Sequence, residues 1–334
     1  MSQENSDARK NKGLLLLVGV LIALVGLAIL LGRYPTPGIT NPFALETDTL
    51  GQSIVFNLRM PRIITAILLG MALGGAGFIF QQSFSNPLVE PGFLGVSPGA
   101  AFGSALAILL FSGRFFIIQT FAIFFSLGGL LLSLFLARII PDSNYKLTLV
   151  FSGIIVSALF SAGLGVIKYI ADPLSQLPEI TFWLLGGLWS ASWSRIVPII
   201  PPVLITLVIL FIFRWRINLM GLDDQVAFTS GFNVKIEKPL FLLIAVIAVA
   251  LLTSIAGIVN WVGLIVPIIS RTIFGGNARF TLPASMINGA IFVLICDTIA
   301  RTLFAGEVPL GVLTALLGSS TFLIVVIFQK KKAL

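Results

Sequence analysis

The chain has 334 residues, of which 57% are hydrophobic and only 10% are charged, with a formal net charge of +8. About a quarter of the residues of a soluble domain are charged, so this composition excludes a soluble globular protein and predicts an all-α integral membrane protein. The basic residues are scattered between apolar runs and do not cluster on one face, which is typical of membrane topology determinants and excludes a nucleic-acid partner.

Histidine is absent, and cysteine occurs once, as Cys296. These counts exclude His-dependent acid–base chemistry, zinc sites and an internal disulfide. We therefore expect this chain to contain no catalytic residue and to bind no metal or cofactor itself.

The first apolar run, Gly13–Gly32, follows a basic start at Arg9, Lys10 and Lys12. A secretory signal has an apolar core of only about 7–15 residues and a cleavage site with small residues, neither of which fits this run. It is predicted to be a retained first membrane helix, preceded by a cytoplasmic tail over residues 1–12.

Nine charge-free stretches can cross a membrane, for which a helix needs roughly 20 apolar residues. One of them, Pro239–Ser270, would extend about 48 Å as a single helix, which is too long for one crossing. It contains Gly257 and Pro267, so we divide it near Gly257–Trp261 and predict ten spans. The other eight stretches are Gly13–Gly32, Ile63–Val89, Pro91–Gly113, Phe115–Ala137, Leu147–Ile167, Ile196–Phe213, Phe280–Cys296 and Val308–Gln329.

Ten spans place both termini on one side of the membrane, and the positive-inside bias identifies that side as the cytoplasm. This N-in, C-in topology gives 14 Lys and Arg residues to the inner face and 7 to the outer face, with residues 330–334 as a cytoplasmic tail. The outer seven are Arg33, Arg59, Arg62, Arg114, Lys168, Arg195 and Arg301.

Three of these outer arginines stand at the ends of apolar spans. Arg59 and Arg62 precede the second span within Phe56–Gly70, and Arg301 follows the ninth. One interpretation is that they snorkel to lipid phosphates. The other is that they form an exposed cationic collar that docks an acidic extracellular partner.

The segment Gln81–Ala100 is rich in Gly, Pro and small polar residues and carries one charge, Glu90. Irregular backbone at membrane depth is tolerated where it is buried in protein or lines a water-filled cavity. Asn86, Pro87 and Leu88 are therefore predicted to form a constriction in a pathway. Candidates for the pathway wall are Gln81, Gln82, Ser152 and Ser157.

The longest polar stretch on the predicted inner face is Arg214–Pro239. Within it, Asp223 or Asp224 can cap a short helix that stops at Gly231. Such a projecting helix is either a handle for a cytoplasmic protein or an ordinary amphipathic connector.

Several segments together resemble the FecCD family, the membrane subunits of type II ATP-binding-cassette (ABC) importers for iron–siderophores, haem and cobalamin. They follow one another along most of the chain as LRMPR (58–62), GFIFQQSFSNPLVEPGFLGVSPGA (77–100), FWLLGGL (182–188), GLDDQVAFTSG (221–231), GIVNWVGLIVPIISR (257–271), LPASMINGAIFVLICDTIAR (282–301) and VPLGVLTALLGSSTFLIVV (308–326).

This resemblance implies a type II ABC importer permease fold in which residues 1–334 form one transmembrane domain. It implies a bacterial or archaeal cytoplasmic membrane, a homodimer of this subunit, an extracytoplasmic binding protein, and two ATPase subunits that carry ATP and Mg²⁺. A ferric siderophore is the cargo expected first; haem, cobalamin and molybdate or tungstate are alternatives.

The resemblance also assigns roles to residues. Arg59, Arg62 and Arg301 would pair with glutamates of the binding protein, and the inner gate would lie at Asn86–Leu88. A coupling segment over residues 215–238 would contact the ATPase. Its coupling residues would be Gly221, Leu222, Asp223, Asp224, Ala227 and Gly231. One departure is Ile268, which stands where the family usually has histidine, whereas Arg271 fits the family pattern.

Two other classes are disfavoured. An ion-driven carrier usually places acidic or histidine residues at the membrane midplane, whereas Glu90 and Glu307 fall in predicted edges or loops. Asp297 lies four residues before Arg301, where a local ion pair is expected. An intramembrane enzyme lacks support because there is no GxSxG motif, and no Walker-type loop is present for ATP.

Overall fold

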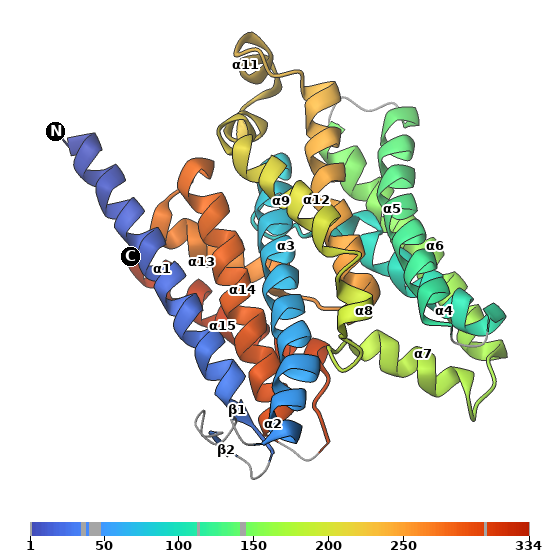
Figure 1. Ribbon diagram of the computed structural model, residues 1–334. Helices are drawn as coiled ribbons and strands as arrows, with labels where there is room; N and C mark the ends of the chain where they lie inside the picture. Colours follow the sequence, from blue (N-terminus) through green and yellow to red (C-terminus); the bar gives the residue numbers. More distant parts are fainter. Residues whose placement is uncertain are drawn as a thin grey trace.

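The computed structural model describes residues 2–34, 38–39, 48–111, 114–140, 145–303 and 306–333. Within these residues, ten helices match the ten predicted spans (Figure 1). They are α1 (Ser2–Leu30), α3 (Met60–Phe84), α4 (Val96–Phe111), α5 (Phe115–Ile139), α6 (Tyr145–Ile170), α9 (Ile200–Ile212), α12 (Val234–Ala256), α13 (Val262–Phe274), α14 (Ala278–Thr302) and α15 (Leu310–Ala333). Met1, Gly113 and Leu334, which bound predicted segments, lie outside the described residues.

Shorter elements connect these helices. Helix α2 (Thr49–Ser53) and the π-helix η2 (Ile54–Arg59) lead into α3 without a break, and β1 (Leu31–Gly32) pairs antiparallel with β2 (Gly38–Ile39). The remaining short helices are η3 (Pro91–Leu94), α7 (Gln176–Leu185), α8 (Trp193–Ile196), α10 (Arg214–Ile217), η4 (Asn218–Gly221) and α11 (Asp224–Thr229). Helix α7 was not predicted; it lies below α4 in the view of Figure 1 and runs obliquely to the spanning helices.

Among the described residues, six helices are individually long and apolar enough to cross a membrane. Helix α9 and its continuation over 214–221, bent by 66°, make a seventh if the pair is counted as one span. Helices α4, α13 and α15 supply shorter apolar stretches. The predicted division of the long run is confirmed, because α12 ends at Ala256 and α13 begins at Val262. Between them Gly257 has a φ of +68° and Trp261 a φ of +73°, so the backbone turns sharply there.

Helix α3 lies at the centre of the bundle and is mostly buried, whereas α1 and α6 leave wide apolar faces exposed. Small residues bring α3 and α14 close together. A Cβ on Gly70 would overlap the backbone oxygen of Gly289 and lie 2.6 Å from the Cα of Ala290. This close approach is typical of helix packing in a bilayer, where small side chains allow backbones to touch.

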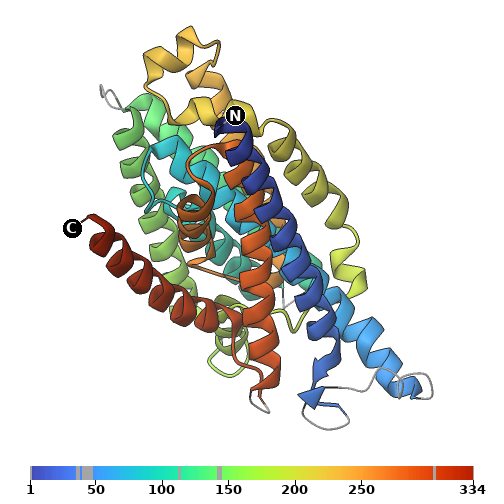
Figure 2. The same cartoon turned by 90° about the vertical axis from the view of Figure 1, so that its left-hand side faces the viewer.

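The two predicted functional regions lie at opposite ends of the molecule. The N-terminus, α11 and the turn between α13 and α14 share one end, and β1, β2 and α2 share the other, in both views (Figures 1 and 2). Because the excess of basic residues belongs to the first end, we call it the inner end and the second the outer end.

Candidate docking site and coupling segment

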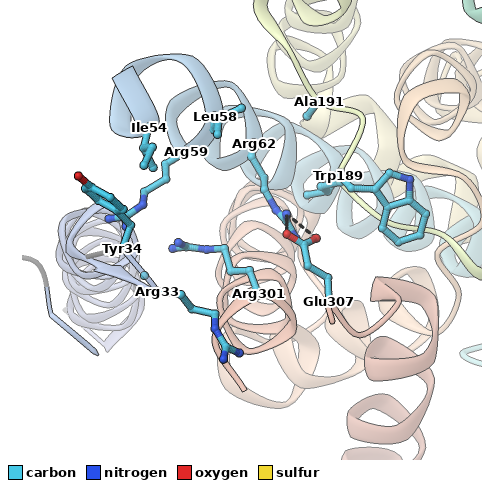
Figure 3. A pocket seen from close by; sticks show the side chains of 12 residues that line it. Arg33, Tyr34, Ile54, Leu58, Arg59, Arg62, Trp189, Ala191, Arg301 and Glu307 are labelled. Carbon is cyan, nitrogen blue, oxygen red and sulfur yellow. Dashed lines mark hydrogen bonds and ion pairs between the residues drawn. The ribbon is translucent and has the colours of Figure 1, made fainter. Parts of the chain in front are cut away.

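A cavity of about 460 Å³ opens at the outer end, and four arginines from three segments line it (Figure 3). Arg33 follows α1, Arg59 and Arg62 lie at the junction of η2 and α3, and Arg301 lies in the last turn of α14. The sequence placed the last three at one membrane edge, and the structure brings them into one site. Arg33 was counted only as an outer charge, so its place in the cavity was missed.

Arg62 is held by two carboxylates. Its Nε donates a 2.7 Å hydrogen bond to Oδ1 of Asp297, and its Nη1 lies 2.7 and 2.8 Å from the two oxygens of Glu307. Asp297 has no exposed surface and lies 3.8 Å from Nε of Arg301. The expected local Asp297–Arg301 pair is therefore present, but Asp297 also makes a shorter contact, which was not predicted, with Arg62 on another helix.

Arg59 and Arg301 bind the carboxyl end of α1. Arg59 Nη1 donates to the carbonyl of Ile29 at 2.7 Å, and Arg301 Nη1 donates to the carbonyl of Leu31 at 2.6 Å. Arg301 Nη2 also donates to the carbonyl of Ala28. The last carbonyls of a helix lack partners within it and carry partial negative charge, so two guanidinium groups stabilise this end.

The prediction of an exposed collar is wrong, because none of the three side chains is widely exposed. The exposed fraction is 7% for Arg59 and 9% for Arg62, and the side chain of Arg301 is 9% exposed. Arg33, by contrast, is exposed. Beside it, burial and the charge of Asp48 raise the pKa of Tyr34, so the Tyr34 hydroxyl stays protonated and donates to Asp48 at 3.5 Å.

At the inner end, α11 forms as predicted. Asp223 is its N-cap and accepts a 3.1 Å hydrogen bond from the backbone N–H of Gln225, and Gly231 follows the helix with a φ of +79°. Asp224 is the first helical residue. Ala227 is 1% exposed, whereas Val226 and Phe228 are 51% and 70% exposed. The helix therefore presents an apolar surface away from the bundle.

A polar clamp joins this segment to α12. Arg216 forms an ion pair through its Nε with Glu237, donates to Glu237 Oε1 from Nη2 at 2.8 Å, and also donates to the carbonyl of Gly231 at 2.8 Å. Glu237 Oε1 accepts the backbone N–H of Asn233 at 2.8 Å. Arg216 thus fixes the end of the projecting segment to the start of a spanning helix.

The predicted gate is an exposed turn after α3. Asn86 Oδ1 accepts the backbone N–H of Leu88 at 2.9 Å, and Ser85 adopts the left-handed conformation with a φ of 50°. Asn86, Pro87 and Leu88 are all exposed. The predicted irregular backbone at Asn86–Leu88 is therefore present and its side chains are exposed. The gating role of this turn stays a prediction.

The predicted pathway wall is only partly supported. Gln81 and Ser152 are fully buried, so neither can line a path in this conformation, and Gln81 instead donates to the carbonyl of Leu264 at 2.9 Å. Ser157 borders a cavity of about 700 Å³. The cavity's other polar lining residues, which sequence reasoning missed, are Glu90, Ser97, Ser161 and Asn260.

Ile268, which stands where the FecCD family usually has histidine, is a buried residue of α13. Its side chain is 9% exposed within α13, and Arg271 one turn later donates from Nη2 to Gln82 Oε1 at 3.1 Å. Nε of Arg271 is buried without a hydrogen-bond partner among the described residues.

The comparisons with known proteins agree with this architecture. The model of the FecCD transport family matches residues 15–328. The chain is 37% identical to the molybdate import system permease protein MolB of Haemophilus influenzae, covering 96% of this chain and 95% of MolB. It is 36% identical to an iron chelatin transport system permease protein of Helicobacter pylori, covering 81% of each chain.

A solved structure described as an inward-facing conformation of a metal-chelate type ABC transporter superposes with a TM-score of 0.87. Its sequence identity to this chain is 35%, and the match covers 95% of this chain and 99% of that one. The chain is a multi-pass protein of the cytoplasmic membrane and belongs to the FecCD transport family, as a permease subunit of an ABC importer.

Proposed function

We propose that two copies of this chain enclose a path that carries a metal-containing cargo inward by alternating access. A binding protein delivers the cargo at the outer end, and two separate ATPase subunits, which hold ATP and Mg²⁺, drive the cycle from the inner end. The observation that carries this proposal is the pairing, on one chain, of a cationic outer cavity with an apolar helix that projects from the opposite end.

The outer cavity favours a carboxylate-bearing partner. Its four guanidinium groups stand against three carboxylates among the described residues, Glu307 in the lining, Asp297 behind Arg62 and Asp48 beside Tyr34, so positive charge is in excess. Arg33 is exposed and available for a bidentate contact with a carboxylate of the binding protein. Arg59, Arg62 and Arg301 contribute mainly by setting the positive potential and the shape of the site, because their own donors also hold α1 and α14.

The projecting segment favours a groove on a soluble partner. Val226 and Phe228 on α11 and the nearby Leu222 are exposed, although α11 lies beyond the spanning helices. An apolar helix surface of this kind binds into a hydrophobic groove. Motion of such a partner would be transmitted through the Arg216–Glu237 clamp to α12.

An ion-coupled mechanism has less support. Among the described residues, Asp297 is the one acidic side chain that is fully buried, and Arg62 pairs with it at 2.7 Å. A carboxylate engaged in this way holds two helices together and is a poor carrier of protons or sodium ions.

For the cargo we propose a ferric siderophore first, with molybdate as the second candidate. Relatives carry names for iron chelatin and Fe(3+)-citrate transport, and others for haemin and cobalamin. Molybdate is favoured by the name of the MolB relative, which matches over nearly the whole chain.

The test is uptake by the complete importer in proteoliposomes, assembled from this chain, its ATPase and its binding protein. We expect ATP-dependent uptake of a radioactive ferric siderophore that requires the binding protein. Uptake of radioactive molybdate alone would select the second candidate. Uptake by this chain without ATPase, driven by an ion gradient, would contradict the proposed function.

A further inference from the structure

The coupling segment touches the end of the central helix through a glycine. Gly221, the last residue of η4, lies against the side chain of Gln82 in the last turn of α3. A Cβ at position 221 would overlap Nε2 of Gln82 and lie 3.0 Å from its Cδ. A side chain at residue 221 would therefore displace the amide end of Gln82 from this position.

The same glutamine also contacts a third element. Arg271, at the end of α13, donates from Nη2 to Gln82 Oε1 at 3.1 Å, and its guanidinium carbon lies 4.9 Å from the ring centre of Phe78, one turn earlier on α3. The amide of Gln82 therefore has its nitrogen against the coupling segment and its oxygen on α13.

Gln82 lies directly before the predicted gate turn. Its backbone carbonyl accepts the N–H of Ser85 at 3.3 Å, and the carbonyl of the preceding Gln81 accepts the N–H of Asn86 at 3.1 Å. A shift of the Gln82 residue is thus passed to the backbone that starts the Asn86–Leu88 turn.

We propose that Gln82 is a positioning residue that relays movement of the coupling segment, through contact with Gly221, to Arg271 on α13 and to the Asn86–Leu88 turn. This inference rests on the proposed function, since it assigns the route by which an ATPase at α11 reaches the path. Gln82 thereby has a role different from lining the pathway. Its amide is suited to this role because one end packs and the other accepts a charge-assisted hydrogen bond.

The test is a double-mutant cycle in the full importer, measured as cargo moved per ATP hydrolysed. Gly221→Ala pushes the Gln82 side chain aside and should lower that ratio by about tenfold, the scale of a lost hydrogen bond to a charged group. Gln82→Ala should lower it similarly. In the Gln82→Ala background, Gly221→Ala should have no further effect, because its steric target is gone.

A control variant and a pair of variants at position 82 distinguish a loss of coupling from a folding defect. Gly276→Ala is the matched control at the inner end, because a Cβ there would meet no atom of the described residues within 4 Å, and it should leave the ratio unchanged. Gln82→Glu keeps an acceptor for Arg271 and should retain more coupling than Gln82→Leu of similar size. All variants are checked for assembly with the ATPase and for melting temperature.

The outcomes separate the relay from the proposed function. Val226→Asp and Phe228→Asp on α11 test ATPase coupling itself; normal transport per ATP in both would overturn the proposed function. If these variants uncouple transport but Gly221→Ala and Gln82→Ala act additively, the proposed function stands and the relay is wrong. Equal coupling in Gln82→Glu and Gln82→Leu would also overturn the relay.

Discussion

Arg62 and Asp297 lie 235 positions apart in the sequence, yet Nε of one is 2.7 Å from Oδ1 of the other. Their contact joins α3 to α14 at the outer end, where the same two helices also approach through Gly70 and Gly289 deeper in the bundle. Both side chains are buried, so removal of either partner leaves the other charge without its nearest compensation.

We expect Asp297→Ala and Arg62→Ala each to lower the stability of the subunit by about 3–5 kcal/mol, the cost of breaking a buried ion pair from one side. The matched control is Asp7→Ala, which breaks an exposed pair with Arg279 at 3.5 Å and should cost about 0–1 kcal/mol. Thermal unfolding in lipid nanodiscs measures both. Equal melting temperatures for the Asp297 and Asp7 variants would contradict the bracing role.

The outer cavity predicts a charge-sensitive docking step. Arg33→Glu should weaken binding of the loaded binding protein by about tenfold at low salt, and the loss should shrink as salt rises, because exposed charges are screened. Arg33 is preferred to Arg59 for this test because Arg59 also holds the carbonyl of Ile29. Surface plasmon resonance on nanodiscs gives the rate and equilibrium constants.

The control for docking is Arg114→Glu, an exposed arginine of the outer end that does not line the cavity. It makes the same charge change and should leave the association rate nearly intact. If both variants weaken docking equally, the effect belongs to net surface charge and the cavity has no special role.

The helical part of the fold was accessible from sequence because membrane helices satisfy their own backbone hydrogen bonds, so length and hydropathy define them. The need to divide Pro239–Ser270 followed from bilayer thickness, and the place near Gly257–Trp261 followed from its glycine and proline residues. Long-range pairs were not accessible: Glu307 is separated from Arg62 by 245 positions, and only the packed bundle brings them together. Local rules therefore favoured Arg301 as the partner of Asp297, and they could not show that Arg59 and Arg62 are buried.

Helix α7 was missed for a related reason. Its ten residues are too few to cross a bilayer and fall between two clear spans, so a span-based prediction passes over them. The α11 cap was predicted well, since Asp223 and Gly231 act within one short segment and need no distant partner.

Because α3 packs closely on α14, alanine substitutions of Gly70 and Gly19 should differ strongly in their effect on stability. Gly70→Ala would place a methyl group against the backbone of Gly289 and should destabilise the bundle by about 1–3 kcal/mol. Gly19→Ala on α1 is the control, because a Cβ there meets no described atom within 4 Å and the change should be neutral or slightly favourable. Melting temperatures of the two variants in the same lipid decide the comparison.

The clamp at the inner end predicts a charge-swap rescue. Arg216→Ala removes the ion pair with Glu237 and the hydrogen bond to the Gly231 carbonyl, so of the polar links between the α11 segment and α12 the 3.9 Å contact of Lys238 with Asp224 remains. We expect ATP hydrolysis to continue while cargo moved per ATP falls by about fivefold to tenfold, the effect of a lost charged hydrogen bond. Arg216→Glu should be more severe, since two carboxylates would then face each other.

Combining Arg216→Glu with Glu237→Arg restores an ion pair with reversed polarity and should recover part of the coupling lost in either single variant. Recovery stays partial because a glutamate at position 216 cannot donate to the carbonyl of Gly231. Arg214→Glu serves as the control. In the described part of the chain Arg214 contacts Phe211, through its carbonyl at 2.7 Å and its ring, and loss of these contacts should leave coupling intact. If the double variant moves no more cargo per ATP than Arg216→Glu alone, the clamp does not transmit movement of the ATPase to α12.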